Sequence, residues 1–316
     1  MPELPEVSII VNQLDKKLKG LILGSVEYDW PKKFDWGGFS IKDLKGVKVV
    51  GVRRLGKVVV IDAISHLPLA ISHRVRKAKG ERRISILIHL KLTGQLIYQD
   101  AKTRIAGGHP IPPLNLPVPN KSTRVTFTFT GGGPTSSRLR GISHLYFNDV
   151  RKFGWVKIVE TSEAKIKEAI GMDLGPDPLT MSLEEFRERL KTKGQWRIKK
   201  LLMDQTFVAG IGNIYSDEAF WRAKIHPRRA AISLSPLEIR NLFRGIRESL
   251  KLAIEKGGSS ASAFVDSGGE RGLYLSYAHA YHMTGKPCAR CKTPIVREKI
   301  DGRSAHFCPF CQKPKA

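Results

Sequence analysis

The first residues of the chain carry an amine with unusual chemistry. Pro2 follows Met1, and Glu3 follows Pro2 directly. Removal of Met1, which a small second residue permits, exposes a secondary amine with a pKa of about 8, so roughly a tenth of it is unprotonated at neutral pH. Its attack on C1′ of a sugar gives only a cationic iminium, an electron sink that favours phosphate elimination. Pro2 is therefore a candidate nucleophile and Glu3 a candidate proton shuttle, although this segment taken alone favours a Pro/Glu-rich helix start.

The four cysteines form a second group with recognisable chemistry. Cys288 and Cys291 are separated by two residues, as are Cys308 and Cys311, and sixteen residues lie between the pairs. This spacing is typical of a four-thiolate zinc ribbon, in which no position remains for an activated water. We therefore predict one structural Zn2+ per chain. Two disulfides or a redox pair are the alternative, which the lack of a secretion signal disfavours.

A turn within residues 205–215 has the composition of an anion site. Gly210 and Gly212 are one residue apart, so backbone N–H groups can approach an anion, and the start of the next helix adds its positive dipole end. Asn213 is an additional donor, and Lys193 and Lys199 add positive charge nearby. A plain corner between two helices remains the alternative.

The overall charge points to a polyanionic partner. Among 316 residues, 54 Lys and Arg stand against 29 Asp and Glu, which leaves a formal charge of +25. Nucleic acid is the leading partner for such a chain, and a merely soluble basic protein is the alternative. No stretch approaches the roughly 20 apolar residues of a membrane helix, and the charged start lacks the apolar core of a signal peptide. We therefore expect a cytosolic protein without a membrane partner.

The elements that position these residues fall into two halves. Apolar residues spaced along one face predict a helix that opens at Pro5 and closes at Gly20. Short β-rich segments follow up to about residue 158 and predict an all-β layer, with strands at residues 47–54, 58–62, 84–89, 124–130 and 145–148. Two Gly/Pro-rich segments, 107–120 and 131–134, are predicted to be surface loops.

The second half is predicted to be helical, after a boundary within residues 162–178. We expect short helices at residues 183–191 and 197–203, and a third that starts near Ile214. The clearest helix follows the capping box at residues 235–238, and Gly257 with Gly258 ends it. Basic residues in the ribbon, Arg290 among them, suggest a hairpin laid on phosphates or a solvated face.

Several motifs together resemble those of the formamidopyrimidine-DNA glycosylase family. They span nearly the whole chain in the right order: residues 2–7, 53–57, 89–94, 148–154 and 210–215, Gly302 with Arg303, and the closing ribbon. The resemblance implies an α+β multidomain fold. It comprises an N-terminal catalytic β-sandwich flanked by helices (1–160), a helix-two-turn-helix DNA-binding domain (176–258), a lesion-capping loop and linker (259–284), and a zinc finger (285–316).

The resemblance also implies roles for individual residues. It makes Pro2 the Schiff-base nucleophile and Glu3 the proton donor. Lys57 is implied to protonate or anchor phosphate during β-elimination, and Arg303, at the finger tip, to serve δ-elimination and phosphate binding. One amine, one carboxyl and two cations suffice for base loss followed by strand cleavage.

A damaged base must leave the duplex to be cut out, and other groups must fill the gap. By resemblance, Leu92, Arg151 and Phe153 are inserted, as an apolar wedge, a guanidinium and a ring. Burial of Leu92 and Phe153 in the β core is the alternative. Leu92 replaces the family's usual Met, a change of similar volume. Histidines that touch DNA in relatives are missing near Ser122, where Lys121, Ser122 and Arg124 are candidate contacts.

We therefore predict a bifunctional glycosylase and apurinic-site lyase. Its expected substrates are 8-oxoguanine and formamidopyrimidines opposite cytosine in damaged duplex DNA. We expect a monomer in the bacterial cytosol, associated with the nucleoid. One alternative is an enzyme like endonuclease VIII that removes oxidised pyrimidines, although that class tends to carry glycine where this chain has Leu4. The other is a catalytically silent binder of damaged DNA, against which Pro2, Glu3 and Lys57 argue.

Overall fold

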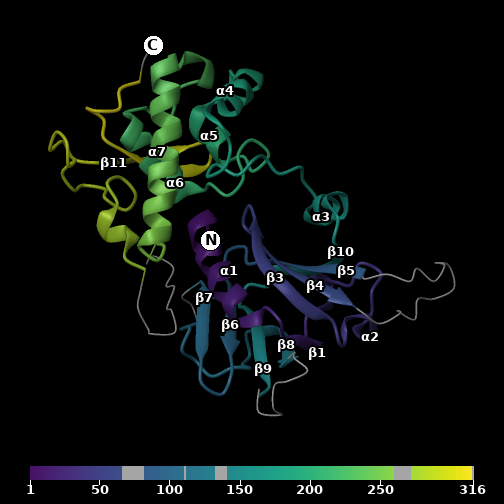
Figure 1. Ribbon diagram of the computed structural model, residues 1–316. Coiled ribbons are helices and arrows are strands. Elements are labelled where there is room, and N and C mark those ends of the chain that lie inside the picture. The colour runs from purple at the N-terminus through teal and green to yellow at the C-terminus, as the bar shows by residue number, and fades with distance from the viewer. Residues whose placement is uncertain (66–81, 110–111, 132–140, 260–271, 315–316) are drawn as a thin grey trace. The chain divides into compact units, whose positions relative to one another are not determined.

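A computed structural model describes residues 1–65, 82–109, 112–131, 141–259 and 272–314 (Figure 1). The chain divides into two compact units. Of the described residues, the first unit holds 1–2 and 6–172, and the second holds 3–5, 173–259 and 272–314. The architecture is a mixed α and β one, with a large sheet in the first unit and helices followed by a terminal hairpin in the second, as predicted. Residues 260–271 of the expected lesion-capping loop lie outside the described ranges.

The first unit is built on a sheet that contains ten strands within the described residues. Their spatial order is β2-β10-β5-β4-β3-β1-β8-β9-β6-β7. In chain order they are β1 (Ile22–Tyr28), β2 (Phe34–Asp35), β3 (Lys48–Leu55), β4 (Val58–Ser65), β5 (Arg82–His89), β6 (Gly94–Gln99), β7 (Arg104–Gly108), β8 (Thr123–Thr130), β9 (Ser143–Asp149) and β10 (Trp155–Glu160).

The sheet forms two five-stranded halves that share one core. The halves meet between β1 and β3, where a single residue pair, Ile22 with Lys48, is in register. Alternate residues of both halves enter the same apolar cluster, such as Ile61 and Ile86 from one half and Phe127 and Leu145 from the other. This sharing gives the sandwich arrangement, since each sheet half can bury only one face against the other.

Helix α1 (Leu4–Leu18) covers this core, as its periodicity predicted. Val7, Ile10, Val11, Leu14 and Leu18 all join the cluster. The five predicted strands are confirmed as β3, β4, β5, β8 and β9. The other five strands of this sheet were not predicted, and neither were α2 (Ile41–Leu44), α3 (Glu163–Ile170) and the 3-10 turn η1 (Pro31–Lys33).

The prediction of a surface loop at residues 107–120 is partly wrong. Gly107 and Gly108 belong to β7, which is tolerated because β7 is the last strand of the sheet order and needs only one partner. Leu114 is buried against Ile97 and Ala106. The guanidinium of Arg104 donates to the carbonyls of Leu114 (2.9 Å) and Leu116 (2.6 Å), which ties the segment to the strand. Residues 132–134 of the second predicted loop lie outside the described ranges.

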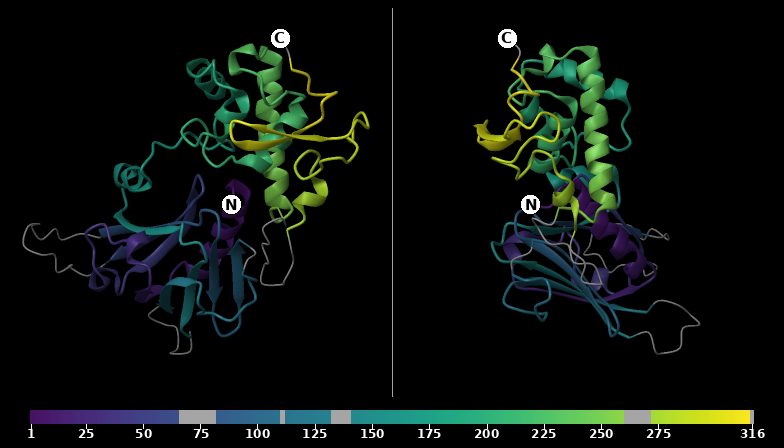
Figure 2. Two further views of the ribbon diagram at one scale, coloured as in Figure 1. Left: turned by 180° about the vertical axis from the view of Figure 1, so that it is seen from behind. Right: turned by 90° about the vertical axis from the view of Figure 1, so that its left-hand side faces the viewer.

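The second unit is helical and ends in a small hairpin. Its helices are α4 (Leu183–Thr192), α5 (Ile198–Met203), α6 (Asn213–Ala223) and α7 (Pro236–Glu255), with 3-10 turns η2 (Ala231–Ser233) and η4 (Tyr274–Tyr277). All four predicted helices are confirmed, and the capping box at Ser235 and Glu238 starts α7 as predicted. The ribbon strands β11 (Val296–Ile300) and β12 (Arg303–Phe307) pair antiparallel, and β12 packs on α6 (Figure 2).

No helix of the described ranges is both long and apolar enough to cross a membrane.

Candidate active site and zinc centre

The carboxylate of Glu3 caps the start of α6. Its two oxygens accept the backbone N–H of Gly212 (2.7 Å) and of Ile214 (3.0 Å), and the residue is only 3% exposed. The first N–H groups of a helix have no partner within the helix and carry its positive dipole end, so they stabilise a negative charge. Glu3 is therefore held in place by backbone groups that lie 209 or more residues away in the sequence.

Glycine at position 212 makes this approach possible. A Cβ there would lie 2.4 Å from the carboxyl carbon of Glu3, which no side chain can occupy. The N–H groups of Gly212 and Ile214 thus bind a carboxylate of the chain itself, and a phosphate contact at this turn stays a prediction that depends on Asn213. The turn itself is braced by Gln205, whose amide oxygen accepts from Gly210 N (2.9 Å) and whose amide nitrogen donates to Ile211 O (2.8 Å).

Asn213 is the first residue of α6. Its Oδ1 is buried and has no hydrogen-bond partner among the described residues. A buried polar atom without a partner is costly, so such an atom commonly marks a site that a ligand or water completes. This amide thus has capacity for an additional contact beside the carboxylate of Glu3.

Pro2 and Lys57 belong to the first unit, and both side chains are buried. Met1 precedes Pro2 in the structure, so the proline nitrogen is an amide nitrogen until that methionine is removed. Lys57 follows Gly56 in the two-residue turn between β3 and β4. Burial, followed by the nearby ammonium groups of Lys91 and Lys57, lowers the pKa of His89 to about 3. His89 is therefore neutral, and its Nδ1 accepts the backbone N–H of Lys91 (2.9 Å).

The three residues expected to fill the DNA gap lie on two turns of the first unit. Leu92 is 40% exposed and Phe153 is 45% exposed, so the alternative that they are core residues is wrong. The guanidinium carbon of Arg151 lies 4.7 Å from the ring centroid of Phe153. Three large side chains, two of them apolar, are thus exposed to solvent, and their exposure does not stabilise the fold.

Asp149 connects the two turns and was not selected from the sequence. Its carboxylate accepts the hydroxyl of Thr93, on the turn that carries Leu92, and the N–H groups of Gly154 (2.6 Å) and Arg151 (3.2 Å). An Asp that binds N–H groups two and five residues ahead is the signature of a side-chain-stabilised turn, and this spacing was the available signal. Asp149 therefore holds residues 150–154 and 92–94 in one arrangement.

Arg124 and Ser122 form hydrogen bonds to the same turn. The guanidinium of Arg124 donates to Asp149 O (2.9 Å), to the carboxylate of Asp29 (2.6 Å) and to Lys121 O (2.9 Å). The carbonyl of Ser122 accepts the N–H of Asp149 (2.8 Å). Both side chains are buried, whereas Lys121 is exposed. Of these three candidate DNA contacts, the structure leaves only the Lys121 side chain in solvent.

Lys199 is also inside the protein. It is 1% exposed and its ammonium lies 2.5 Å from Asp217 of α6. The second oxygen of Asp217 accepts both the backbone N–H and the ring Nδ1 of His306, each at 2.9 Å. Because a buried ion pair is costly to break, this lysine is better suited to fix the ribbon than to contact DNA directly. Lys193, by contrast, is half-buried at the end of α4, with its ammonium 4.7 Å from the Trp196 ring centroid.

Arg303 starts β12 and is exposed. It lines an open depression of about 370 Å³ together with Trp196, Lys200, Met203 and Asp301. His306 stands three residues further along the same strand. The bond of His306 to Asp217 therefore sets the position of the strand that carries Arg303.

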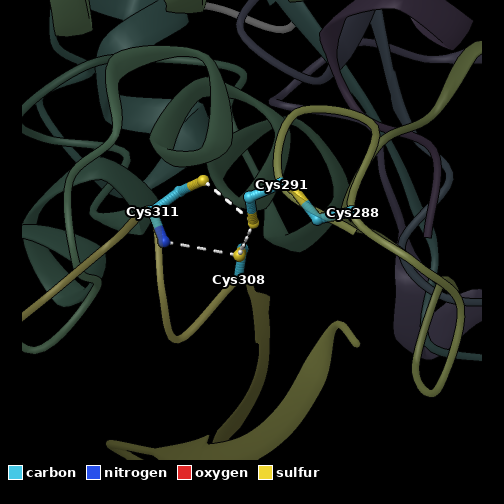
Figure 3. A group of neighbouring side chains, drawn as sticks. All are labelled: Cys288, Cys291, Cys308 and Cys311. Carbon is cyan, nitrogen blue, oxygen red and sulfur yellow. Dashed lines mark hydrogen bonds between the residues drawn. The ribbon is translucent and has the colours of Figure 1, made fainter. Parts of the chain in front are cut away.

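The four cysteine sulfurs converge on one point (Figure 3). They all lie within 4.8 Å of one another, and the cysteines are not disulfide-bonded. Four sulfurs at the usual Zn–S distance of 2.3 Å would be about 3.8 Å apart in a tetrahedron, so the cluster fits one zinc ion. The indole Nε1 of Trp221, on α6, donates to the sulfur of Cys288 at 3.4 Å. The ribbon has little core of its own, and a metal is needed to hold both knuckles together.

Further interactions fasten the zinc ribbon to α6. Glu218 is fully buried and accepts the backbone N–H groups of His279, Ala280 and Tyr281 at 2.8 to 3.1 Å. Arg290, one of the basic residues predicted to lie on phosphates or on a solvated face, has its guanidinium carbon 3.9 Å from the ring centroid of Trp221. The helix that holds Glu3 at its first turn thus also holds the ribbon that carries Arg303.

Removal of zinc is expected to release the ribbon without unfolding the helices. Stripping the metal with a chelator should remove hydrogen-exchange protection from β11 and β12, and DNA affinity should fall at least roughly tenfold, because structural zinc supplies most of the folding free energy of such a hairpin. The core of α4 to α7 contains no zinc ligand and should keep its protection. Readdition of zinc is the control, and unchanged ribbon protection after chelation would contradict the structural role.

Models of one family match nearly the whole chain. A model described as "Formamidopyrimidine-DNA glycosylase N-terminal domain" matches residues 1–156, and one described as "Formamidopyrimidine-DNA glycosylase H2TH domain" matches residues 174–265. The chain belongs to the formamidopyrimidine-DNA glycosylase family. A third model, "Zinc finger found in FPG and IleRS", matches residues 285–314 and agrees with the thiolate cluster.

Full-length relatives and solved structures agree with this assignment. The chain is 36% identical to a formamidopyrimidine-DNA glycosylase of Pelotomaculum thermopropionicum over all of both chains. It is 34% identical to one of Enterococcus faecalis, over 100% of this chain and 98% of that one. The complex of Lactococcus lactis Fpg with abasic-site DNA has a TM-score of 0.76 and 30% identity, over 99% of this chain and 100% of that one.

The chain is therefore a DNA glycosylase that acts on damaged DNA in base-excision repair, and its terminal ribbon carries one structural zinc.

Proposed function

We propose that the enzyme removes oxidised purines, 8-oxoguanine and formamidopyrimidines, opposite cytosine, and then cleaves the strand by β,δ-elimination. The observation that carries this proposal is the carboxylate of Glu3, held on the N-terminus of α6 directly after the candidate nucleophile Pro2 in the chain. A carboxyl group fixed by two backbone donors keeps its position while the sugar changes, which is what proton transfer in a transition state requires.

The proposed reaction begins once Met1 has been removed. The unprotonated amine of Pro2 attacks C1′ of the damaged nucleotide, the glycosidic bond breaks, and the base leaves with a proton. The carboxylate of Glu3 takes up a proton from water and delivers it to O4′, so the C1′–O4′ bond breaks, the sugar ring opens and the C1′–N bond becomes an iminium. Loss of a proton from C2′ expels the 3′ phosphate, and a second elimination expels the 5′ phosphate. Water then hydrolyses the iminium and returns the amine.

Two cations stabilise the departing phosphates in this scheme. We assign Lys57 to the β-elimination and Arg303 to the δ-elimination, since an ammonium and a guanidinium both form charge-assisted hydrogen bonds to phosphate oxygens. Lys57 lies in the turn of one β-hairpin and Arg303 is the first strand residue after the turn of another, which supports a fixed direction of approach.

We propose that Leu92, Arg151 and Phe153 fill the gap left by the extruded nucleotide. Their exposure, and the tie through Asp149 that holds their two turns together, support this role. An apolar wedge and a ring supply stacking, while the guanidinium contacts the orphaned base. Asn213, Lys193 and Lys121 are the proposed direct DNA contacts. Ser122, Arg124 and Lys199, which are buried, would act by positioning their neighbours.

Removal of oxidised pyrimidines is the second candidate function. A structural relative, Lactococcus lactis Fpg in complex with DNA containing an oxidised pyrimidine, favours it, with a TM-score of 0.76 and 31% identity. We further propose a monomer with four functional parts, residues 1–160, 176–258, 259–284 and 285–316.

Borohydride trapping separates these functions. The purified protein is incubated with duplexes that carry either 8-oxoguanine or an oxidised pyrimidine, reduced, and mapped by mass spectrometry. An adduct on Pro2 that forms faster with the purine supports the proposal, whereas preference for the pyrimidine moves the enzyme to the second function. Tight binding with no adduct on either duplex would leave only a silent binder, and retained Met1 in the intact mass would remove the attacking atom.

Replacing Asn213 with alanine is expected to weaken DNA binding across all sequences, by roughly fivefold to thirtyfold, because one hydrogen bond near a charged group is removed. The measurement is equilibrium binding to duplexes of several sequences, with and without a lesion. The control is Asn241→Ala on α7, whose amide oxygen accepts from the exposed Arg244. A defect confined to one sequence would instead make Asn213 a base-reading residue.

A further inference from the structure

A cationic groove lies along the outer edge of the sheet in the first unit. It encloses about 540 Å³ and is lined by Pro31, Lys32, Lys33, Phe34, Asp35, Trp155 and Lys157. None of these residues takes part in the reaction proposed above. The groove is made by η1 and β2, which run beside β10 in the sheet.

The charge of this groove is unbalanced. Lys32 and Lys33 are exposed, and among the described residues they have no carboxylate within ion-pair distance. The only acidic lining residue, Asp35, accepts the N–H of Gly37 (2.9 Å). Lys157 is held in place by a bond from its ammonium to Ala169 O (2.6 Å) and lies 5.4 Å from the ring centroid of Trp155. Three ammonium groups around an open groove favour a polyanion.

The groove starts at the end of the sheet from which the turns of Lys57, Leu92 and Phe153 project, because Trp155 lines it. Trp155 pairs with His89, and His89 pairs with Val58, so the three strands end in register. The turns that carry Lys57, Leu92 and Phe153 all project from this end. Phe153 lies in the turn before β10 and Lys157 is the third residue of that strand, so the four-residue step between them spans at most about 13 Å. That length equals the rise of about four base pairs.

We propose that this groove binds the phosphate backbone of the DNA duplex that flanks the lesion, about four base pairs from the extruded nucleotide. The inference rests on the proposed insertion of Phe153 at the lesion. Lysines contact phosphates as point charges and without base specificity, so the groove adds affinity that does not depend on sequence. When Phe153 is inserted at the lesion, the phosphate backbone of the flanking duplex is the polyanion that lies nearest to this edge of the sheet.

The test combines a charge variant with duplexes of different reach. Lys32→Gln/Lys33→Gln is compared with the unaltered protein on a duplex that carries a stable tetrahydrofuran abasic-site analogue and has about 12 base pairs on either side. Two further duplexes are shortened on one side only, so that each ends about two base pairs from the analogue on that side. One is shortened on the 5′ side of the analogue and the other on its 3′ side. The matched control is Lys42→Gln/Lys45→Gln, which removes the same charge from two exposed residues. Lys42 lies in α2 and Lys45 follows it, just before the end of β3 that is opposite to the Lys57 turn.

With the long duplex, the variant should bind roughly tenfold more weakly at 0.1 M salt. The slope of log affinity against log salt should fall by about 1.8, or 0.9 for each phosphate that the variant no longer neutralises. The defect should vanish on one truncated duplex and persist on the other, while the control keeps the unaltered slope.

An equal salt slope for the variant and the unaltered protein on all duplexes would overturn the inference, and would leave a protein partner as the occupant of the groove. A defect of the same size on both truncated duplexes would also overturn it, because the interaction would then lie at the lesion. Excision of 8-oxoguanine by the unaltered protein is measured in parallel. Absence of excision would refute the proposed function, whereas the groove is judged by binding alone.

Discussion

Replacing Pro2 with glycine is expected to reduce strand cleavage and borohydride trapping at least about 100-fold while DNA affinity stays within about twofold. A glycine terminus still offers an amine, but a primary amine forms an iminium that can lose its N–H proton. The resulting neutral imine is a poor electron sink, so elimination of the phosphates slows. The measurements are single-turnover base release, strand cleavage and equilibrium binding on an 8-oxoguanine duplex.

The comparison of the three readouts decides the role of this residue. Loss of binding together with loss of cleavage would make Pro2 a structural residue, which its burial also permits. Unchanged cleavage and trapping would show that another amine attacks the sugar. Intact mass of both proteins is the control, because a retained Met1 blocks the amine in either sequence.

Replacing Gly212 with alanine is expected to lower the rate of base excision by about 10²- to 10⁴-fold, the range that general acid–base catalysis supplies. The new Cβ would lie 2.4 Å from the carboxyl carbon of Glu3, so the carboxylate must leave the N–H groups of Gly212 and Ile214. The backbone angles of Gly212 lie in the extended region, so the substitution tests the close approach and not a left-handed conformation. Single-turnover excision and the melting temperature are measured together.

Two variants make this result interpretable. Gly141→Ala adds the same methyl group at a glycine whose Cβ would have no atom of the described residues within 4 Å, and should change neither excision nor stability. Glu3→Gln keeps the size of the side chain and removes its acid–base capacity, so it should match Gly212→Ala in excision. Excision by Gly212→Ala at the unaltered rate would show that the cap on Glu3 has no part in the reaction. A fall in melting temperature alone would give it a purely structural role.

The spacing of residues that are near neighbours in the chain was enough to predict the zinc ligands and the main helices. The Cys288 and Cys308 knuckles follow from two short intervals, because each pair of thiolates meets one ion within a tight turn. The apolar stripe of α1 and the capping box of α7 were also readable, since a helix repeats every few residues. Strands such as β4 and β5 were found from their β-branched apolar composition. The strands β6 and β10 were missed, because they lie beside turn residues and their alternation is short.

The sequence by itself determined the family, the ligands of the zinc and the adjacency of Pro2 and Glu3, because all of these are statements about near neighbours in the chain. Only the tertiary structure decided that the Glu3 carboxylate binds backbone N–H groups at the start of α6, 209 residues away in the chain. It also decided that Asp149 joins two turns and that Lys199 is buried against Asp217. These interactions join distant segments, and a pairing of distant residues leaves no periodic trace in a single sequence.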